Sequence, residues 1–337
     1  METIWQLEIG ITLFLQSLGA SLAGPMKFFS FFGTEGFYIL ILPALYWCID
    51  SVLGLRVGVM LILTGSVNSI FKVLIHGARP YWFDANVQSF STETSFGMPS
   101  GHAQNSISVL GLIATSIKRK WLSWVIWVLV FMIGLSRIYL GVHFTTDVLL
   151  GWSIGIILLV GFIKFEKPVG KWLASRSLGG QLRLIVIIAL VIILMSFLSV
   201  LSLGPNYSVP SEWVTNATAN GGEAPNPLDI NGAFTLSGIF LGLAGGFAYL
   251  KNKFNGFDAG GKIEHRILRY LIGLVGIMIL YAGLGAIFPR SEDLIGYALR
   301  FFRYTLIGVW VSFLAPMIFI RLKIAQPLNS KSTEKEG

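Results

Sequence analysis

The sequence predicts an all-α fold, a polytopic bundle of transmembrane helices. One observation is composition, because 54% of the 337 residues are hydrophobic and only 12% are charged. The mean hydropathy is +0.72, and so few charges cannot cover a water-soluble surface. The other observation is the length of the apolar runs. Leu184 to Leu203, whose only polar residues are small serines, is long enough to cross about 30 Å of hydrocarbon at about 1.5 Å per residue.

Apolar runs along the chain predict about nine spans, with boundaries at 29–49, 53–75, 101–117, 121–140, 146–165, 183–203, 232–250, 267–289 and 298–320. Residues 4–24 are apolar enough to span, yet Glu8, Gln16 and Pro25 would also suit an interfacial helix, so their placement stays open. The predicted organisation is an N-terminal apolar or interfacial helix (1–28), a membrane core (29–203), an extracytoplasmic loop (204–231), additional C-terminal transmembrane helices (232–322) and a polar cytoplasmic tail (323–337).

Basic residues predict the orientation of the spans. Alternate loops hold 18 of the 25 Lys and Arg residues, and such an excess marks the cytoplasmic side. The residues on the opposite side are Lys27, Lys72, Arg79, Arg137, Arg290, Arg300 and Arg303. The net charge of +8 therefore indicates topology and not nucleic-acid binding. We expect an integral protein of the plasma or inner membrane, or of an endomembrane in a eukaryote.

Three of the external cations stand where spans meet loops. Lys72 lies at the end of the second predicted span, and Arg79 follows seven residues later, before Pro80. Arg137 lies near the end of the fourth span. Charged groups beside apolar spans are costly and usually have a local partner. A fixed anion such as phosphate would suit all three, since Arg offers forked donors and Lys a point charge.

The segment Pro99-Ser100-Gly101-His102 stands at the predicted start of the third span. Free backbone N–H groups at a helix N-terminus favour an anion, and Gly101 lets the backbone approach a ligand closely. Ser100 could cap the helix as well as contact the anion. His102 can supply a proton.

The segment from Ser136 to Asp147 contains a second histidine, His143, four residues before Asp147. If this stretch is helical, the two side chains lie on one face, about 6 Å apart along the axis. A carboxylate there can hold one ring nitrogen as N–H and leave the other as a nucleophile. The structural alternative is an ion pair between Asp147 and Arg137.

Together these segments resemble the three motifs of the type 2 phosphatidic acid phosphatase superfamily. Those motifs are a Lys, six residues and Arg-Pro; Pro-Ser-Gly-His; and Ser-Arg, five residues, His, three residues and Asp. They read here as Lys72 to Pro80, Pro99 to His102 and Ser136 to Asp147, without a gap. The resemblance covers about residues 30 to 165. It implies a six-helix phosphatase core, to which this chain adds about three C-terminal spans.

The resemblance also implies a role for each matched residue. His143 would attack phosphorus and form a phosphohistidine, Asp147 would orient His143, and His102 would protonate the leaving alkoxide and then activate water. The residues that would bind the phosphate are Lys72, Arg79, Ser100, Gly101 and Arg137. The cations would neutralise the charge that Mg²⁺ neutralises in many kinases. The sequence has no His/Cys cluster or carboxylate pair at metal-ligand spacing, so we expect no metal and no cofactor.

The resulting hypothesis is a metal-independent membrane lipid phosphate phosphohydrolase with its site on the extracytoplasmic face. One alternative is a lipid phosphotransferase, in which the phosphohistidine passes to another alcohol. Vanadate-dependent haloperoxidases share the three motifs, but they are soluble, so the many apolar spans argue against them. A non-catalytic lipid-phosphate binder or transporter is a further alternative, although it would not need His143, Asp147 and His102 at their catalytic spacings.

The motifs contact the phosphate and not the lipid tail, so several substrates stay open: polyprenyl phosphates or diphosphates, phosphatidic acid, phosphatidylglycerophosphate and sphingoid phosphates. The residues Thr34 to Tyr38, with Tyr46-Trp47 after them, are similar to the sphingosine-phosphate phosphatase branch. The expected partners are a lipid phosphate substrate and membrane lipids, with no nucleic acid. A homo-oligomer is left open.

Overall fold

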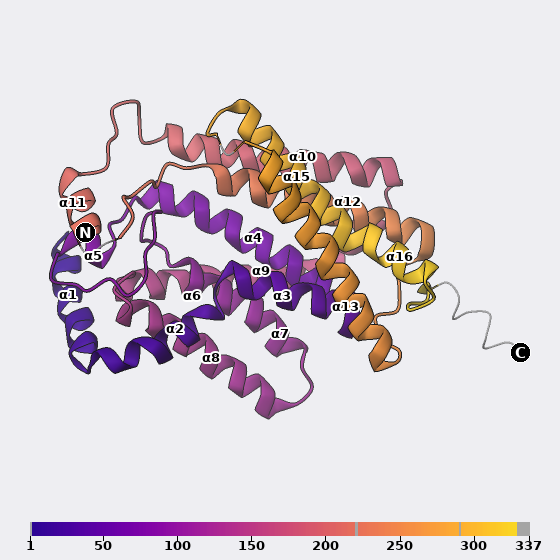
Figure 1. The fold of residues 1–337 in the computed structure, drawn as a ribbon, viewed down its shortest axis with the longest axis horizontal. Coiled ribbons are helices and arrows are strands. Elements are labelled where there is room, and N and C mark those ends of the chain that lie inside the picture. The colour runs from indigo at the N-terminus through magenta and orange to yellow at the C-terminus, as the bar shows by residue number, and fades with distance from the viewer. Residues whose placement is uncertain (1, 220–221, 290, 329–337) are drawn as a thin grey trace, which may run out of the picture. The chain divides into compact units, whose positions relative to one another are not determined.

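The computed structural model describes residues 2–219, 222–289 and 291–328, and Figure 1 shows its ribbon. Within these ranges the chain is built from helices and turns, and the one strand-like pairing is an isolated bridge between Phe257 and Pro327. The predicted all-α class is therefore confirmed. Arg290 and the predicted tail from residue 329 onward lie outside the described residues.

The helices fall into two compact units that interleave along the sequence. Unit 1 comprises residues 1–38, 63–163 and 195–229, and unit 2 comprises residues 39–62, 164–194 and 230–337. The helices in chain order are α1 (Glu2–Ser17), α2 (Ala23–Phe31), α3 (Glu35–Ala44), α4 (Ser51–Ile75), α5 (Pro80–Phe83), α6 (Gly101–Asn105), α7 (Gly111–Ser116), α8 (Lys120–Tyr139), α9 (Thr145–Ala174), α10 (Leu178–Leu201), α11 (Ser211–Ala219), α12 (Asn231–Phe254), α13 (Ile263–Met278), α14 (Leu284–Ile287), α15 (Leu294–Val309) and α16 (Ala315–Arg321). Every residue predicted for the site belongs to unit 1.

Seven helices in the described ranges are long and apolar enough to cross a membrane, or eight if a bent pair at the N-terminus counts as one span. This number is lower than the nine predicted, because two predicted spans are short or broken. The segment 29–49 is interrupted between α2 and α3, where Thr34 Oγ1 donates to the carbonyl of Phe31 (2.7 Å) and accepts the N–H of Phe37 (3.3 Å). The segment 101–117 forms a helical run of α6, a π-helical turn and α7 that ends at Ser116.

The N-terminal residues 4–24, whose placement the sequence leaves open, form part of that bent pair. α1 and the helical run from Ala20 to Phe31 meet at an angle of 89°. Gly19 stands at the bend with a φ of +118°, a conformation that glycine adopts without steric cost. The hydroxyl of Tyr139 donates to the carbonyl of Gly19 at 2.7 Å, so the bend is fixed against the end of α8.

A buried aromatic core holds the loops of unit 1. Its largest members are Trp5, Tyr81, Trp82, Phe96, Tyr139 and Phe144. The loop after α5 is anchored to this core because Tyr81 Oη donates to the carbonyl of Glu93 at 2.8 Å. The segment that follows α10 also binds here: Asn216 Nδ2 donates to the carbonyl of Trp82 (3.0 Å), and the N–H of Asn226 donates to the carbonyl of Thr94 (2.9 Å).

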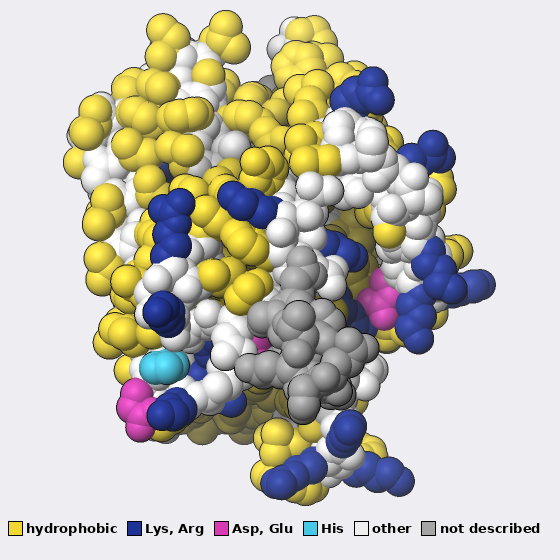
Figure 2. All heavy atoms as spheres, turned by 90° about the vertical axis from the view of Figure 1, so that its right-hand side faces the viewer, with side chains coloured by type: hydrophobic (Ala, Val, Ile, Leu, Met, Phe, Trp, Pro, Cys, Tyr) yellow, Lys and Arg dark blue, Asp and Glu magenta, His cyan; other side chains and the backbone are white. Residues whose placement is uncertain are grey.

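In unit 2, α12 packs closely against α15. A Cβ atom at Gly242 would lie 2.1 Å from the carbonyl oxygen of Thr305, and one at Gly238 would lie 2.5 Å from that of Phe301. Small residues thus let the two backbones approach each other, as in many transmembrane helix pairs. The last turn of α12 carries basic residues and so does that of α16, and Figure 2 shows a face on which Lys and Arg side chains gather.

Candidate active site

His143 lies in the turn between α8 and α9 and is only 1% exposed. Its Nδ1 is 3.2 Å from Asp147 Oδ2, and the same carboxylate oxygen accepts the backbone N–H of Phe144 at 3.0 Å. The structure brings His143 and Asp147 together, as their spacing predicts, although the stretch between them is not fully helical, because α9 begins at Thr145. Asp147 is the third residue of α9, so its carboxylate reaches back to the N–H of Phe144, the residue before the helix, and the same oxygen lies beside Nδ1 of His143.

The contact between His143 and Arg79 indicates which ring nitrogen of His143 carries the hydrogen. Arg79 Nη1 lies 3.3 Å from His143 Nε2, and a guanidinium can only donate hydrogen bonds. Nε2 is therefore the acceptor, and Nδ1 carries the hydrogen that it donates to Asp147. Burial, followed by the charges of Arg79 and Lys72, lowers the pKa of His143 well below its ordinary value. The ring is thus neutral, with the lone pair of Nε2 on the side of the cations.

The guanidinium group of Arg79 donates hydrogen bonds to backbone carbonyls of two different loops, and Arg79 is only 1% exposed. Its Nε donates to the carbonyl of Ser95 at 2.7 Å, and Nη2 donates to the carbonyl of Phe96 at 3.1 Å. Nη1 donates to the carbonyl of Val142 at 2.9 Å. The ammonium group of Lys72 donates to the same Phe96 carbonyl. The loop after α5 therefore places two of the predicted phosphate-binding cations side by side.

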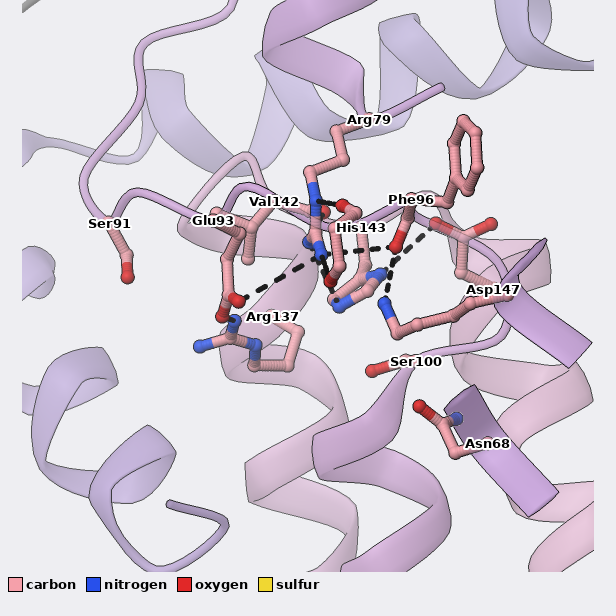
Figure 3. Close-up of polar contacts among 12 residues, drawn as sticks. Asn68, Arg79, Ser91, Glu93, Phe96, Ser100, Arg137, Val142, His143 and Asp147 are labelled. Atoms are coloured by element: carbon pink, nitrogen blue, oxygen red, sulfur yellow. Dashed lines mark hydrogen bonds and ion pairs between the residues drawn. The ribbon is translucent and has the colours of Figure 1, made fainter. Parts of the chain in front are cut away.

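Arg137, the third cation, projects from the last turn of α8 and is 2% exposed. Its Nη1 donates to Ser30 Oγ at 2.6 Å, and its Nη2 forms an ion pair with Glu93. Glu93 Oε2 also lies 3.9 Å from Arg79 Nη2, so one carboxylate bridges two guanidinium groups (Figure 3). Burial opposes the ionisation of Glu93, but Arg137 and Arg79 outweigh it and hold the pKa of this carboxyl below its ordinary value.

Ser100 is the N-cap residue of α6, and its side chain is fully buried. Its Oγ accepts the N–H of Ala103 at 3.4 Å, which is the capping role that the sequence allows for it. The N–H of Ser100 donates to the carbonyl of Asp147 at 3.0 Å, so α6 is tied to α9 beside the histidine. A Cβ atom at Gly101 would lie 3.0 Å from Asn68 Oδ1, and this close approach favours glycine.

His102 is half-buried at the start of α6. Its ring lies against the turn between α2 and α3, because a Cβ atom at Gly33 would be 2.7 Å from His102 Cδ2. Glu93 and Arg137 are near enough to interact electrostatically with it. The ring forms no hydrogen bond with any other residue in the described part of the chain. His102 therefore stands in the site without a protein partner for either ring nitrogen.

The arrangement brings one ammonium and two guanidinium groups into the same part of unit 1 as a neutral histidine, with Glu93 between the two guanidinium groups. Such a site can bind a tetrahedral anion and place it against Nε2 of His143. In the ranges that the structure describes, no group of three or more His, Cys, Asp or Glu side chains has the geometry to hold a metal ion.

Comparison with protein families matches two regions of this chain. The family described as the PAP2 superfamily matches residues 53–171, which include all three motifs. The family described as PAP2 superfamily phosphatase, transmembrane extension, matches residues 234–327. The chain belongs to the type 2 phosphatidic acid phosphatase (PAP2) superfamily. The resemblance read from the motifs is thus confirmed, and the extra C-terminal helices correspond to a known extension of PAP2 phosphatases.

Several curated relatives are similar to this PAP2 chain. Phosphatidylglycerophosphatase B of Bacillus subtilis is 33% identical over 125 residues, which cover 34% of this chain and 59% of the relative. The lipid A 4'-phosphatase of Porphyromonas gingivalis is 40% identical over 86 residues, which cover 26% of this chain and 35% of the relative. Human glucose-6-phosphatase 2 is 27% identical over 274 residues, which cover 70% of this chain and 73% of the relative. The chain thus matches about half the length of the first two relatives.

Some residues of the PAP2 site are missing from the sequence-based prediction. Glu93 carried a signal that could have been used, since it is an acidic residue in the same predicted loop as the cation Arg79. Ser30, which binds Arg137 across 107 positions of sequence, carried none. The contacts of Ser95 and Phe96 with Arg79 use backbone carbonyls, which no side-chain pattern can reveal.

Proposed function

We propose that this PAP2 protein is a metal-independent lipid phosphate phosphohydrolase that acts through a phosphohistidine intermediate. The observation that supports this most directly is the state of His143: Asp147 holds Nδ1, and Nε2 faces the Arg79 guanidinium. A neutral imidazole whose unprotonated nitrogen lies beside a cation that could bind phosphate has the properties of a nucleophile. The phosphatase names of the curated relatives support the same reaction class.

In the first step, Nε2 of His143 attacks phosphorus, and the bond between phosphorus and the lipid oxygen breaks. The electron pair of that bond leaves with the oxygen, which takes a proton from the imidazolium form of His102, a form that the negative charge of the bound phosphate would favour. Asp147 stabilises the positive charge that develops on the imidazole, as the carboxylate does in other histidine-dependent hydrolases. Lys72, Arg79 and Arg137 would stabilise the negative charge on the phosphoryl oxygens.

In the second step, His102 accepts a proton from water while the water oxygen attacks the phosphohistidine. The phosphorus–nitrogen bond breaks, its electron pair returns to Nε2, and orthophosphate leaves. Both histidines are then in the protonation states in which they began. An alcohol in place of water would give phosphotransfer by the same route.

The substrate class and the side of the membrane belong to this proposal. A lipid substrate is supported by the seven apolar helices and by the phosphatidylglycerophosphatase and lipid A phosphatase relatives. The glucose-6-phosphatase relative makes a soluble phosphate monoester the second substrate to test. An extracytoplasmic site is supported by the excess of Lys and Arg in the loops at the other ends of the spans.

The test is phosphate release by the full-length protein in detergent micelles that contain different lipid phosphates at equal surface concentration, with glucose 6-phosphate as the soluble comparison. We expect release from at least one lipid phosphate, unchanged activity in EDTA, and a loss of roughly 10³-fold or more in His143→Ala. His265→Ala, which removes a histidine of unit 2, is the matched control. Activity that chelation abolishes, or that His143→Ala retains, would refute the mechanism.

A further inference from the structure

Glu8, in the N-terminal helix α1, has a buried carboxylate that contacts the first turn of α9, next to Asp147. It is 8% exposed. Its Oε1 accepts the backbone N–H of Thr146 at 2.9 Å, and its Oε2 accepts the hydroxyl of the same threonine at 2.8 Å. A buried carboxylate that accepts two hydrogen bonds from one residue fixes the position and the orientation of that residue.

Thr146 is the second residue of α9 and directly precedes Asp147. The first N–H groups of a helix have no partner within the helix, and a negative charge there also interacts favourably with the helix dipole. Glu8 supplies both the acceptor and the charge at the first turn of α9. The carboxylate of Asp147, one residue further along, holds Nδ1 of His143 at 3.2 Å.

A second contact from α1 reaches the other side of the same turn. The ring of Trp5 stacks on that of Phe144, with centroids 5.7 Å apart and planes inclined by 5°. Phe144 lies between His143 and the start of α9, and its N–H also binds Asp147. Helix α1 therefore contacts the residues on both sides of Thr145, although it lies outside the region 53–171 that matches the PAP2 family.

We propose that Glu8 is a positioning residue for the reaction. It holds the first turn of α9 so that Asp147 meets Nδ1 of His143 in the orientation that leaves Nε2 directed at the phosphate site. This inference rests on the proposed function. None of the contacts of Lys72, Arg79 or Arg137 involves Glu8, so its loss should change the attack on phosphorus more than the binding of phosphate.

The two simplest variants separate geometry from charge. In Glu8→Gln, the amide oxygen can accept the N–H of Thr146 while the amide nitrogen donates to the threonine hydroxyl oxygen. The turn stays fixed, and we expect kcat to fall by less than about fivefold. In Glu8→Ala both donors lose their partner. Because a misplacement of 1 Å can cost about 100-fold, we expect kcat to fall by roughly 10- to 100-fold with KM changed by less than about threefold.

A double-mutant cycle tests whether Glu8 acts through Thr146. Thr146→Val removes the hydroxyl and keeps the shape, so it should lower kcat by several-fold without changing KM. Because Glu8→Ala already removes the acceptor of the threonine hydroxyl, the Glu8→Ala/Thr146→Val double variant should be no worse than Glu8→Ala alone. Glu2→Ala is the matched control, since Glu2 is an exposed carboxylate of the same helix.

Wild type and His143→Ala distinguish a failure of the proposed function from a failure of the proposed role of Glu8. If wild type releases no phosphate from any substrate, the proposed function fails. If wild type is active and His143→Ala is not, then wild-type kcat in Glu8→Ala, or equal losses in Glu8→Gln and Glu8→Ala, would overturn the role of Glu8. If Glu8→Ala does not fold, as judged by its thermal melting curve, unchanged kcat in Thr146→Val would overturn it. The gel-filtration profile and melting curve of each variant are measured alongside.

Discussion

Glu93 binds Arg137 from the loop after α5 and at the same time lies 3.9 Å from Nη2 of Arg79. A carboxylate thus neutralises two of the cations that the proposed reaction needs for the phosphate. A phosphate that enters the site brings a second anion next to this carboxylate. Like charges at such separations in a poorly solvated site repel strongly, so we expect Glu93 to weaken the binding of a phosphate to these cations.

The first prediction concerns this carboxylate. Glu93→Gln removes the competing charge and leaves Arg137 without an ion pair, so the substrate-free protein should melt at a lower temperature. Orthophosphate or vanadate should raise the melting midpoint of Glu93→Gln by several degrees more than that of wild type, and should inhibit the variant at a several-fold lower concentration. Glu212→Gln, an exposed carboxylate in the same unit, is the control. Equal midpoint shifts in Glu93→Gln and wild type would show that Glu93 does not compete with the anion.

The second prediction tests the assigned tautomer of His143. In Asp147→Asn the amide nitrogen can donate to Nδ1, which moves the ring hydrogen to Nε2 and blocks attack. We expect phosphate release to fall by about 10⁴-fold, as in comparable carboxylate–histidine pairs. Vanadate binding, which depends on the three cations, should change by less than about threefold. A variant that still forms an acid-labile phosphoenzyme from radiolabelled substrate at the wild-type rate would contradict this assignment.

The third prediction is a dependence of stability on pH. The pKa of His143 in the folded protein lies well below its ordinary value, whereas the unfolded chain has a histidine pKa of about 6.5. As the pH falls below about 6.5, the unfolded chain binds a proton that folded His143 does not bind. Stability is therefore lost toward acid, by up to about 1.4 kcal/mol per pH unit for this group. Above about pH 6.5 the unfolded chain no longer binds this extra proton, and the burial of His143 then costs no stability through protonation.

The measurement is the thermal midpoint between about pH 6.5 and pH 4.5, a range that lies above the ordinary pKa of glutamate. His143→Asn should show a shallower fall of the midpoint over this range than wild type, because the unfolded variant has one histidine fewer to protonate. His265→Asn provides the comparison in unit 2. If His143→Asn and wild type lose stability in parallel, the buried histidine is not the source of the acid sensitivity.

The fourth prediction uses the close packing at Gly97, which follows the Phe96 carbonyl that binds both Lys72 and Arg79. A Cβ atom at Gly97 would lie 2.4 Å from the backbone oxygen of Ala78, so the loop must move in Gly97→Ala. We expect a loss of about 1–3 kcal/mol in stability and more than a tenfold loss of activity. Gly161→Ala in α9, where a Cβ atom meets nothing within 4 Å, should be neutral or slightly stabilising. A Gly97→Ala protein with wild-type melting and activity would disprove this account.

The sequence was informative wherever short spacing and residue type were enough. Helical periodicity, apolar run length and the three motifs predict the helical membrane fold and the cations that meet around His143. The error in the first predicted span has a local cause, since the hydroxyl of Thr34 closes one helix and starts the next within an apolar run. Short polar residues of this kind compete with the helical backbone for hydrogen bonds, and the hydropathy of the run hides that competition.

Other features depend on contacts between residues far apart in the chain. Glu8 binds Thr146 across 138 positions, and Glu93 binds Arg137 across 44. No periodic pattern links such residues, because the loop conformations that bring them together are fixed by tertiary hydrogen bonds. A single glutamate in α1 also looks like an ordinary solvated side chain until its burial is known. Those parts of the site therefore could not be predicted from the sequence.

Unit 1 includes residues 195–229, which follow a segment of unit 2 in the sequence, and this limits how the protein can be shortened. The PAP2 match ends at residue 171, but a truncation there would remove the last segment of unit 1. It would remove Trp213, whose ring lies 6.3 Å from that of Trp5 and 6.2 Å from that of Trp82. It would also remove the N–H of Asn226 that holds Thr94, the neighbour of Glu93. Any shortened version that keeps these contacts must therefore retain residues 195–229, the last segment of unit 1.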